Sequence, residues 1–197
     1  MLAEYKNKLR TFEEAASLVK SGDLVLTGQA LGGCSPEFYD ALLARHEELR
    51  DVVLMDILQL RPSKVYDPEY MAQFDGHINY WNSFGVGMVR KINSSKVPDC
   101  YPAQTSDCID KFSERADVFI CMVSPPNSKG YVNMGPCNFF SSEVIKKGRA
   151  SGKQRLTIAE VNDQVPIIYG DNWLHISNFD CFIEHSSPMP IVKRGEP

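Results

Sequence analysis

The sequence lacks a long hydrophobic run, a surplus of basic residues and an apolar segment at its start. No apolar run approaches the roughly 18 residues of a membrane-spanning helix, so we expect no membrane partner. Lys and Arg number 21 against 25 Asp and Glu, for a formal net charge of −4. That balance argues against nucleic acid as a partner, because nucleic-acid binding usually needs a basic face. The charged opening, MLAEYKNKLR, has no signal-peptide core, so export is not expected.

Motifs for metal and redox chemistry are also missing. The six cysteines are widely spaced and form no C-x-x-C pair, so we predict neither a zinc site nor a redox pair. The four histidines form no spaced pair, and no H-E-x-x-H or G-x-S-x-G motif occurs. We therefore expect no metal, no resident cofactor and a reduced, cytoplasmic protein.

What is present is an alternation of apolar strand-like runs and amphipathic segments. A chain of 197 residues is long enough for one domain with a sizeable core. The alternation predicts an α/β fold with an open, mostly parallel sheet flanked by helices. The predicted strands are residues 24–28, 51–58, 117–123 and 155–161, with two short extended pieces within 173–187. The predicted helices are residues 12–19, 36–49, 85–95, 106–116 and 138–152, and residues 59–84 are expected to be irregular.

Two of these helices carry recognisable start signals. Thr11 and Glu14 stand at capping-box spacing. Ser35 precedes Pro36, which suits an N-cap followed by proline at the first helical position.

Three loops follow predicted strands and are candidates for ligand contact, because ligands of parallel sheets bind outside the carboxyl ends of the strands. The first loop contains Gln29, Gly32 and Gly33. Adjacent glycines let the backbone approach a ligand closely, and the helix that follows presents free N–H groups to an anion. The alternative is a capped turn between a strand and a helix with no ligand.

The second loop reads VSPPNSKGYVNMG, over residues 123–135. Its two prolines stiffen the strand exit, Asn127 is suited to an Asx-turn, and Gly130 is suited to a positive φ. Such a loop would hold Ser124, Tyr131 and Asn133 in fixed positions, as a substrate pocket requires. The alternative is a well-formed turn with a tyrosine packed on it.

The third loop follows the run IAEVND, in which Glu160 is a carboxylate inside an otherwise apolar strand. A buried carboxylate has to be paired or hydrogen-bonded, which makes Glu160 and the nearby Asn162 candidates. An exposed position on an edge strand is the other interpretation.

Several segments, taken in order, resemble a known family. They are KLRTFEEAASLVKSGDLVLTGQALGGCSPEFYDALLAR (8–45), SFGVGMVRKI (83–92), VSPPNSKGYVNMG (123–135), IAEVNDQVP (158–166) and LHIS (174–177). The chain is similar to the amino-terminal domain of the acetyl-CoA hydrolase/transferase family, especially its 4-hydroxybutyrate and butyrate:acetate CoA-transferases. The resemblance implies a CoA-transferase half with the α/β fold already predicted, acyl-CoA and carboxylic acid substrates, and no metal.

The resemblance also implies that this chain lacks the catalytic nucleophile. In that family a glutamate of a second α/β domain carries the reaction, and no glutamate here matches its motif, so we assign no catalytic residue. We expect residues 1–187 to form the amino-terminal domain and residues 188–197 to begin an interdomain linker. The implied partners are a carboxyl-terminal catalytic domain or subunit and, for the complete enzyme, further copies in a homo-oligomer. Part of the aromatic segment 66–90 is predicted to meet such a partner.

By resemblance this half would supply a wall of the acyl or carboxylate pocket. The candidate substrate-binding residues are Gln29, Gly32, Gly33, Ser124, Pro125, Asn127, Gly130, Tyr131, Asn133, Glu160 and Asn162. Two other functions remain open: a non-catalytic module that binds acyl-CoA or carboxylates, and an acetyl-CoA hydrolase that uses Glu160 as a base.

Overall fold

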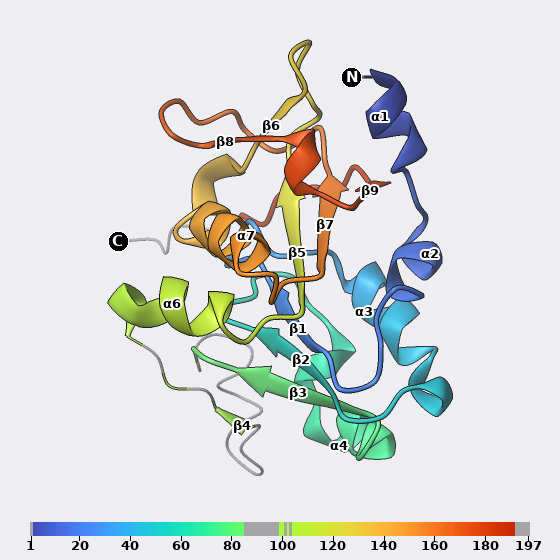
Figure 1. Cartoon of the computed structure of the whole chain (residues 1–197). Helices are drawn as coiled ribbons and strands as arrows, with labels where there is room; N and C mark the ends of the chain where they lie inside the picture. Colours follow the sequence, from blue (N-terminus) through green and yellow to red (C-terminus); the bar gives the residue numbers. More distant parts are fainter. Residues whose placement is uncertain (1, 85–98, 101, 103, 192–197) are drawn as a thin grey trace, which may run out of the picture.

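A single parallel sheet forms the centre of the protein (Figure 1). The computed structural model describes residues 2–84, 99–100, 102 and 104–191. Within them seven strands follow the order β4-β3-β2-β1-β5-β7-β9, and every neighbouring pair is parallel. The strands are β1 (Leu24–Thr27), β2 (Val52–Asp56), β3 (Ile78–Asn82), β4 (Asp99–Cys100), β5 (Val118–Val123), β7 (Leu156–Val161) and β9 (Cys181–Glu184). A separate antiparallel ribbon pairs β6 (Tyr131–Asn133) with β8 (Trp173–His175).

Helices cover both faces of the sheet, as the predicted α/β fold requires (Figure 1). The α-helices are α1 (Leu2–Asn7), α2 (Phe12–Ala16), α3 (Pro36–Leu43), α4 (Pro68–Met71), α6 (Cys108–Ser113) and α7 (Ser141–Ala150). Short 3-10 helices are η1 (His46–Glu48), η2 (Lys64–Tyr66), η3 (Ala72–Phe74), η4 (Thr105–Asp107), η5 (Gly135–Cys137) and η6 (Ile176–Asn178).

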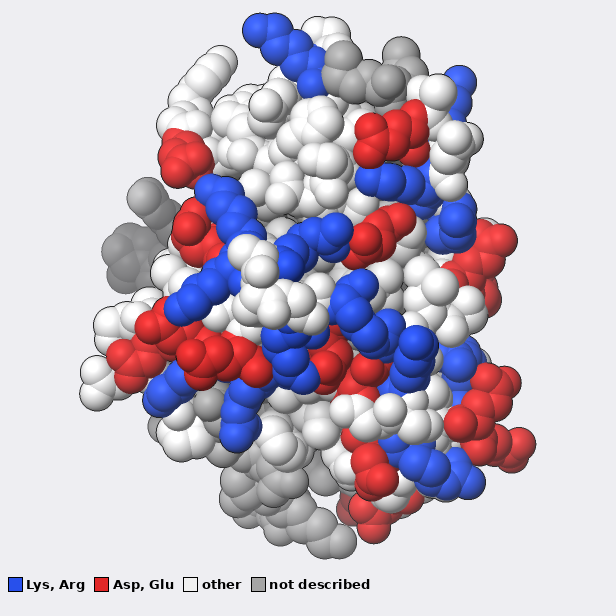
Figure 2. Space-filling view, in the orientation of Figure 1, with Lys and Arg blue, Asp and Glu red and all other residues white. Residues whose placement is uncertain are grey.

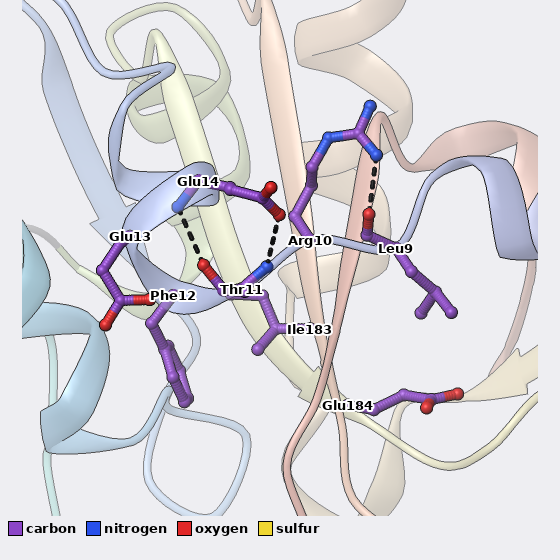
Figure 3. A pocket seen from close by; sticks show the side chains of 8 residues that line it. All are labelled: Leu9, Arg10, Thr11, Phe12, Glu13, Glu14, Ile183 and Glu184. Carbon is purple, nitrogen blue, oxygen red and sulfur yellow. Dashed lines mark hydrogen bonds between the residues drawn. The ribbon is translucent and has the colours of Figure 1, made fainter.

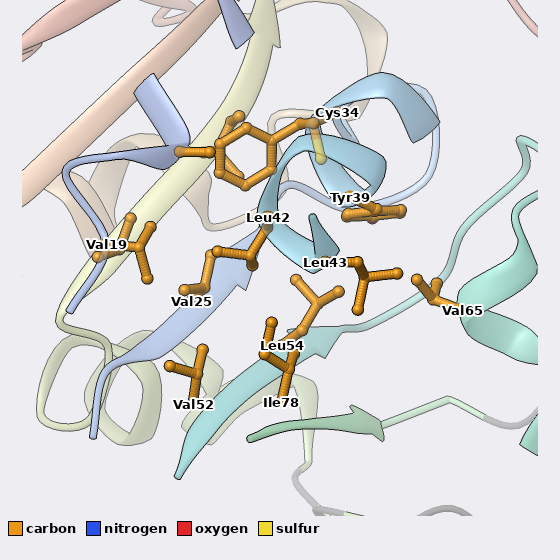
Figure 4. Packing of buried hydrophobic residues seen from close by; sticks show 14 of the residues in the cluster. Val19, Val25, Cys34, Tyr39, Leu42, Leu43, Val52, Leu54, Val65 and Ile78 are labelled. Carbon is orange, nitrogen blue, oxygen red and sulfur yellow. The ribbon is translucent and has the colours of Figure 1, made fainter. Parts of the chain in front are cut away.

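The core is divided by the sheet into two hydrophobic clusters. Val25 and Leu26 of β1 belong to opposite clusters, because successive residues of a strand point to opposite faces of the sheet. One cluster packs α2, α3 and α4 against the sheet, and Figure 4 shows Tyr39, Leu42 and Leu43 of α3 in it. The other cluster packs α6 and α7 on the opposite face. Burial on both faces explains why β5 is a continuous apolar run and why β7 is apolar apart from Thr157 and Glu160.

The predicted helix starts are present, with one difference. Thr11 Oγ1 accepts a hydrogen bond from the Glu14 amide at 3.2 Å, and Glu14 Oε2 accepts one from the Thr11 amide at 2.9 Å, so the capping box is confirmed. Pro36 opens α3 as expected. The Ser35 side chain makes no capping bond, however, because it is directed to another partner described below.

The expectation that residues 59–84 are irregular is wrong. This segment contains η2, α4, η3 and the complete strand β3. Asp67 caps α4 by accepting from the amide of Glu69 at 2.9 Å. Strand β3 alternates buried Ile78, Tyr80 and Asn82 with half-buried residues, a period of two that its polar composition concealed. The helix predicted at 85–95 lies outside the described residues, as do residues 192–197 of the expected linker.

Part of the aromatic segment 66–90 packs within its own domain, and its contact with a partner stays a prediction. The side chains of Tyr66, Phe74 and Tyr80 are buried in this domain's own core. Trp81 is partly buried and packs against a core cluster, whereas Phe84 is 52% exposed. Residues 85–90 lie outside the described part of the chain. Packing within the domain therefore accounts for most of this segment.

The surface carries charges of both signs. Figure 2 shows acidic and basic side chains interspersed over one face of the molecule. Among the described residues, no helix combines the length and the apolar character needed to cross a membrane.

Candidate functional site

The carboxyl ends of the parallel strands bring polar residues from distant parts of the sequence to one edge of the sheet (Figure 1). Strands β1, β5, β7 and β9 are consecutive neighbours there. The loop after β1 donates the amide of Gly28 to the Ile120 carbonyl of β5 at 2.8 Å, and the amide of Met122 bonds the Gly32 carbonyl at 2.9 Å. The first predicted loop is therefore held against β5, the strand that leads into the second loop.

Glu160 is the centre of a buried hydrogen-bonded group. Its side chain has no exposed surface, so the edge-strand interpretation is wrong. One carboxylate oxygen accepts from the Ser35 amide at 2.7 Å, and the other accepts from the Ser35 hydroxyl and lies 3.0 Å from His185 Nδ1. His185 Nδ1 also lies 3.2 Å from Ser35 Oγ, so the histidine belongs to the same hydrogen-bonded group. Glu160 thus fixes the start of α3 and the end of β9.

The glycines of the first loop serve close packing of the backbone. A Cβ atom on Gly28 would lie 2.1 Å from the Gly32 carbonyl oxygen, and one on Gly33 would lie 2.4 Å from the Gln59 side chain. Gln59 in turn donates to Thr27 Oγ1 at 3.0 Å. Gly32 and Gly33 are buried, whereas Gln29 is half-buried. The contact of these three residues with a substrate stays a prediction.

Asn162 and Arg61 approach the same atoms from different loops. Asn162 Nδ2 donates to the Ser187 carbonyl at 2.8 Å and lies 3.3 Å from Met122 Sδ. Arg61 Nη2 lies 3.5 Å from Met122 Sδ and 3.4 Å from Ser187 Oγ. Arg61 Nη1 is buried and has no hydrogen-bond partner among the described residues.

Asp56 ends β2 at the same edge and is completely buried. It accepts hydrogen bonds from the Tyr80 hydroxyl at 2.7 Å and from Asn82 Nδ2. Burial raises the pKa of Asp56 to about 7, although both hydrogen bonds oppose the rise. Burial, and next the charge of Glu160, also raise the pKa of the Cys34 thiol, so this cysteine is not an activated nucleophile.

The second loop forms the turn that its residues predicted. The Asn127 side chain accepts from the amides of Lys129 and Tyr131 at 2.9 and 3.0 Å, and Gly130 has a φ of 78°. Asn127 and Pro125 are exposed, and Tyr131 is 40% exposed with its ring 5.1 Å from that of His175. The loop therefore presents Tyr131 on the β6–β8 ribbon, beyond the end of β5 (Figure 1).

Ser124 and Asn133 are buried inside this loop and bond its backbone. Ser124 Oγ accepts from the Asn133 amide at 2.9 Å. Asn133 Oδ1 accepts from the amides of Gly135 and Ile168 and from Asn172 Nδ2, while its Nδ2 donates to the Ile168 carbonyl at 2.8 Å. Their side chains stabilise the loop, and direct contact with a substrate stays a prediction.

Sequence reasoning missed Arg61, Gln59 and His185. Arg61 and Gln59 follow β2, so the rule that selected three loops would have found them if it had also been applied to the strand predicted at residues 51–58. His185 follows β9, which was expected only as a short extended piece. No local signal marks His185 as the partner of Glu160.

A pocket lies beside this edge, at the start of α2 (Figure 3). It is lined by residues 9–14 together with Ile183 and Glu184. Figure 3 shows the capping box of Thr11 and Glu14 in this lining, and Arg10 bonded to the Leu9 carbonyl. Within the described residues no group of three or more His, Cys, Asp or Glu side chains is placed to hold a metal ion.

Comparison with known proteins identifies the family. Residues 2–193 match the family described as acetyl-CoA hydrolase/transferase N-terminal domain. The chain is 31% identical over 210 residues to a probable butyrate:acetyl-CoA coenzyme A-transferase of Syntrophomonas wolfei, covering 100% of this chain and 43% of that protein. It is 27% identical over 188 residues to a 4-hydroxybutyrate coenzyme A transferase of Clostridium kluyveri, covering 94% and 41%. The chain thus spans less than half the length of these curated relatives.

Solved structures agree with the sequence comparison. RipA from Yersinia pestis superposes with a TM-score of 0.81 at 25% identity, covering 100% of this chain and 47% of that one. A 4-hydroxybutyrate CoA-transferase from Porphyromonas gingivalis superposes with a TM-score of 0.74 at 22% identity, which shows the shared fold, and covers 99% and 43%. The chain therefore belongs to the family of acetyl-CoA hydrolase/transferase N-terminal domains.

Proposed function

We propose that the chain is the amino-terminal half of a CoA-transferase that moves CoA between an acyl-CoA and a short-chain carboxylic acid. The observation that carries the proposal is the family match over residues 2–193, together with relatives named as CoA-transferases. The acids expected are of the butyrate, 4-hydroxybutyrate or acetate type. The reaction would take place in the cytoplasm, and the free state of the five cysteines whose side chains the structure describes fits a reducing compartment.

The proposed chemistry is nucleophilic catalysis by a glutamate that this chain does not contain. That carboxylate attacks the acyl-CoA thioester and expels the CoA thiolate, which leaves a mixed anhydride. The thiolate attacks the glutamyl carbonyl, so that the acyl group leaves as a free carboxylate and CoA stays on the enzyme as a thioester. A second acid takes the CoA through the reverse steps. Backbone N–H groups that bind the developing oxyanions would accelerate each attack. Coenzyme A enters as substrate, and no resident cofactor or metal is needed.

The role of this chain would be to form one wall of the active-site cleft, opposite a carboxyl-terminal domain or subunit. The glycine loop after β1 and the carboxyl ends of β5 and β7 lie at the sheet edge where ligands of parallel sheets bind. The complete enzyme is proposed to be a homo-oligomer. Glu160 suits a supporting role better than the hydrolytic base of the alternative function, because it is fully buried and both its oxygens already accept hydrogen bonds.

The test is CoA exchange between acetyl-CoA and a panel of short carboxylic acids. It compares the chain alone with the chain combined with a polypeptide that supplies the second half of the relatives' length. We expect exchange only in the combination, with an enzyme–CoA thioester that borohydride traps on a glutamate of the second part. Trapping on a glutamate of the isolated chain would overturn the assignment. Release of free CoA without any acceptor acid would support the hydrolase, and binding without turnover in the combination would support the non-catalytic module.

A further inference from the structure

The loop between β7 and β8 exposes three consecutive apolar side chains, Ile167, Ile168 and Tyr169. Tyr169 is 90% exposed. Phe139, on the segment between β6 and α7, is 65% exposed. Single exposed apolar side chains are common on soluble proteins, but an apolar group of this kind usually marks a surface that another molecule covers. These four residues are called the apolar surface below.

The contacts of the loop fix its exposed residues in place. Asn133 of β6 donates to the Ile168 carbonyl at 2.8 Å and accepts from the Ile168 amide at 3.1 Å. Asn172, after the exposed residues, donates to the Gly135 carbonyl at 2.8 Å. Before them, Val165 packs so closely that a Cβ atom on Gly135 would lie 2.8 Å from its Cγ1. The exposure of residues 167–169 is therefore built into the fold, because the loop is anchored on both sides and at its centre.

Phe139 has a backbone conformation that disfavours its own side chain. Its φ is 42°, in the left-handed region where a bulky residue is an outlier and glycine is preferred. The neighbouring Asn138 holds the segment, because its side chain accepts from the Ser142 amide at 3.0 Å. Backbone strain of this kind concentrates at functional sites. The stability of this domain alone therefore does not explain an exposed phenylalanine at this position.

The surroundings of the apolar surface are poor in charge. Figure 2 shows an area free of charged side chains over the β6–β8 ribbon and the loop before β8, whereas charges crowd the lower half of the same face. The centres of protein interfaces are depleted of charged residues and enriched in aromatic ones. A nucleic acid or an anionic lipid surface would instead require basic side chains here. A protein with an apolar surface of its own therefore fits this area best.

The apolar surface stands at the edge of the sheet where the last described residues also lie. The exposed loop follows β7 directly. Asn162, at the start of that loop, donates to the Ser187 carbonyl at 2.8 Å, which holds the segment after β9 against it. The matched relatives are more than twice as long as the part that this chain covers. In such a relative the polypeptide that follows residue 191 would start from the same edge as the apolar surface.

We propose that the carboxyl-terminal part of the enzyme docks on the apolar surface formed by Phe139 and residues 167–169. This inference rests on the proposed CoA-transferase function. It assigns to that part a complementary apolar surface, into which Tyr169 and Phe139 insert as aromatic anchors. Docking there leaves the glycine loop after β1 free to contact substrates, because the apolar surface is carried by the ribbon and the loop after β7.

The experiment measures association between the separately purified 197-residue chain and the second part, which supplies the rest of the relatives' length, by isothermal titration calorimetry without CoA or acid. The double variant Ile168→Ser/Tyr169→Ser should raise the Kd by about 30-fold, as for the loss of an interface hot spot. Phe139→Gly should raise the Kd by about 10-fold and leave the Tm of the chain alone unchanged or higher, because glycine accepts a positive φ. The matched control is Leu18→Ser, at an exposed leucine just after α2, which packs on the opposite face of the sheet from α7; it should change the Kd by less than about twofold.

The outcomes separate the docking surface from the proposed function. An unchanged Kd for the double variant would overturn the docking surface, and so would the absence of any association between the wild-type parts. Self-association of the chain that the double variant abolishes, with full affinity for the second part retained, would assign the surface to a second copy and refute the proposal. A complex that weakens in the variants and transfers no CoA to any acid would support the docking surface and refute the proposed function. Transfer of CoA by a combination whose affinity the variants leave unchanged would refute the docking surface alone.

Discussion

Replacing Asp56 by Asn should remove a large part of the pH dependence of folding. Burial raises the pKa of Asp56 from its ordinary value of 3.8 to about 7 in the folded protein. The folded state therefore holds a proton on Asp56 at pH values where the unfolded state has lost it. The corresponding stability is present below pH 3.8 and is lost as the pH rises through about 7. The full difference corresponds to about 4 kcal/mol, at about 1.36 kcal/mol per pH unit.

The measurable part of this effect lies between pH 5 and pH 8. Over that interval the same linkage relation gives a loss of about 2.5 kcal/mol in the free energy of unfolding. An asparagine cannot ionise, so Asp56→Asn should show no such loss. Its amide group has to replace an oxygen that accepts from Tyr80 or Asn82, which should cost about 1 kcal/mol. We therefore expect the variant to be more stable than the wild type by about 0.7 kcal/mol at pH 5 and by about 3 kcal/mol at pH 8.

The assay is urea unfolding at pH 5, 6, 7 and 8, followed by circular dichroism. The control is Asp75→Asn, which changes an exposed aspartate just before β3 and should follow the wild-type curve. A constant separation between the Asp56→Asn and wild-type curves from pH 5 to pH 8 would show that Asp56 is ionised in the folded state throughout this range. The reasoning from burial would then be wrong.

Three further predictions concern the loops. Glu160→Gln should lower the free energy of unfolding by about 2 kcal/mol in a denaturant titration, because an amide nitrogen replaces an oxygen that accepts buried hydrogen bonds. An unchanged free energy of unfolding would contradict the described hydrogen-bond network. In the same assay, Gly28→Ala should lower the free energy of unfolding by about 3 kcal/mol, because the new Cβ meets the backbone carbonyl of Gly32. Gly33→Ala should lower it by about 1 kcal/mol, because the new Cβ meets the movable side chain of Gln59. The reverse order of the two costs would refute this explanation. Asn133→Ala should lower the stability measured by thermal unfolding by about 3 kcal/mol, whereas Asn127→Ala, at an exposed asparagine, should lower it by less than about 1 kcal/mol. Equal losses would mean that the buried contacts of Asn133 contribute little to stability.

The last of these changes our first expectation for the second loop. Its place beyond a strand made Asn133 a candidate substrate-binding residue in the sequence analysis. The structure shows a completely buried side chain with backbone partners on two segments. Tyr131 keeps the original expectation, because it is 40% exposed and its loss should change kcat/KM more than the urea midpoint.

The sequence by itself determined the fold class and the chemistry of the turns. Residues 118–123 are apolar throughout, and residues 156–161 are apolar apart from Thr157 and Glu160, which indicates strands buried on both faces; both strands are present. The capping box at Thr11 and the Asx-turn at Asn127 were predictable because each is closed by residues within four positions of each other. Local interactions of this kind depend on the order of residues alone.

The tertiary structure decided which residues share the site. The sheet order β4-β3-β2-β1-β5-β7-β9 places β1 beside β5, so Ser35 meets Glu160 across 125 positions of sequence. The same order brings Arg61 to Met122 and to the residues after β9. Neither pairing leaves a local signal, because a strand's periodicity indicates which side chains it buries and not which strand becomes its neighbour. The polar pairs at the carboxyl edge exist only once the long-range strand pairing has formed.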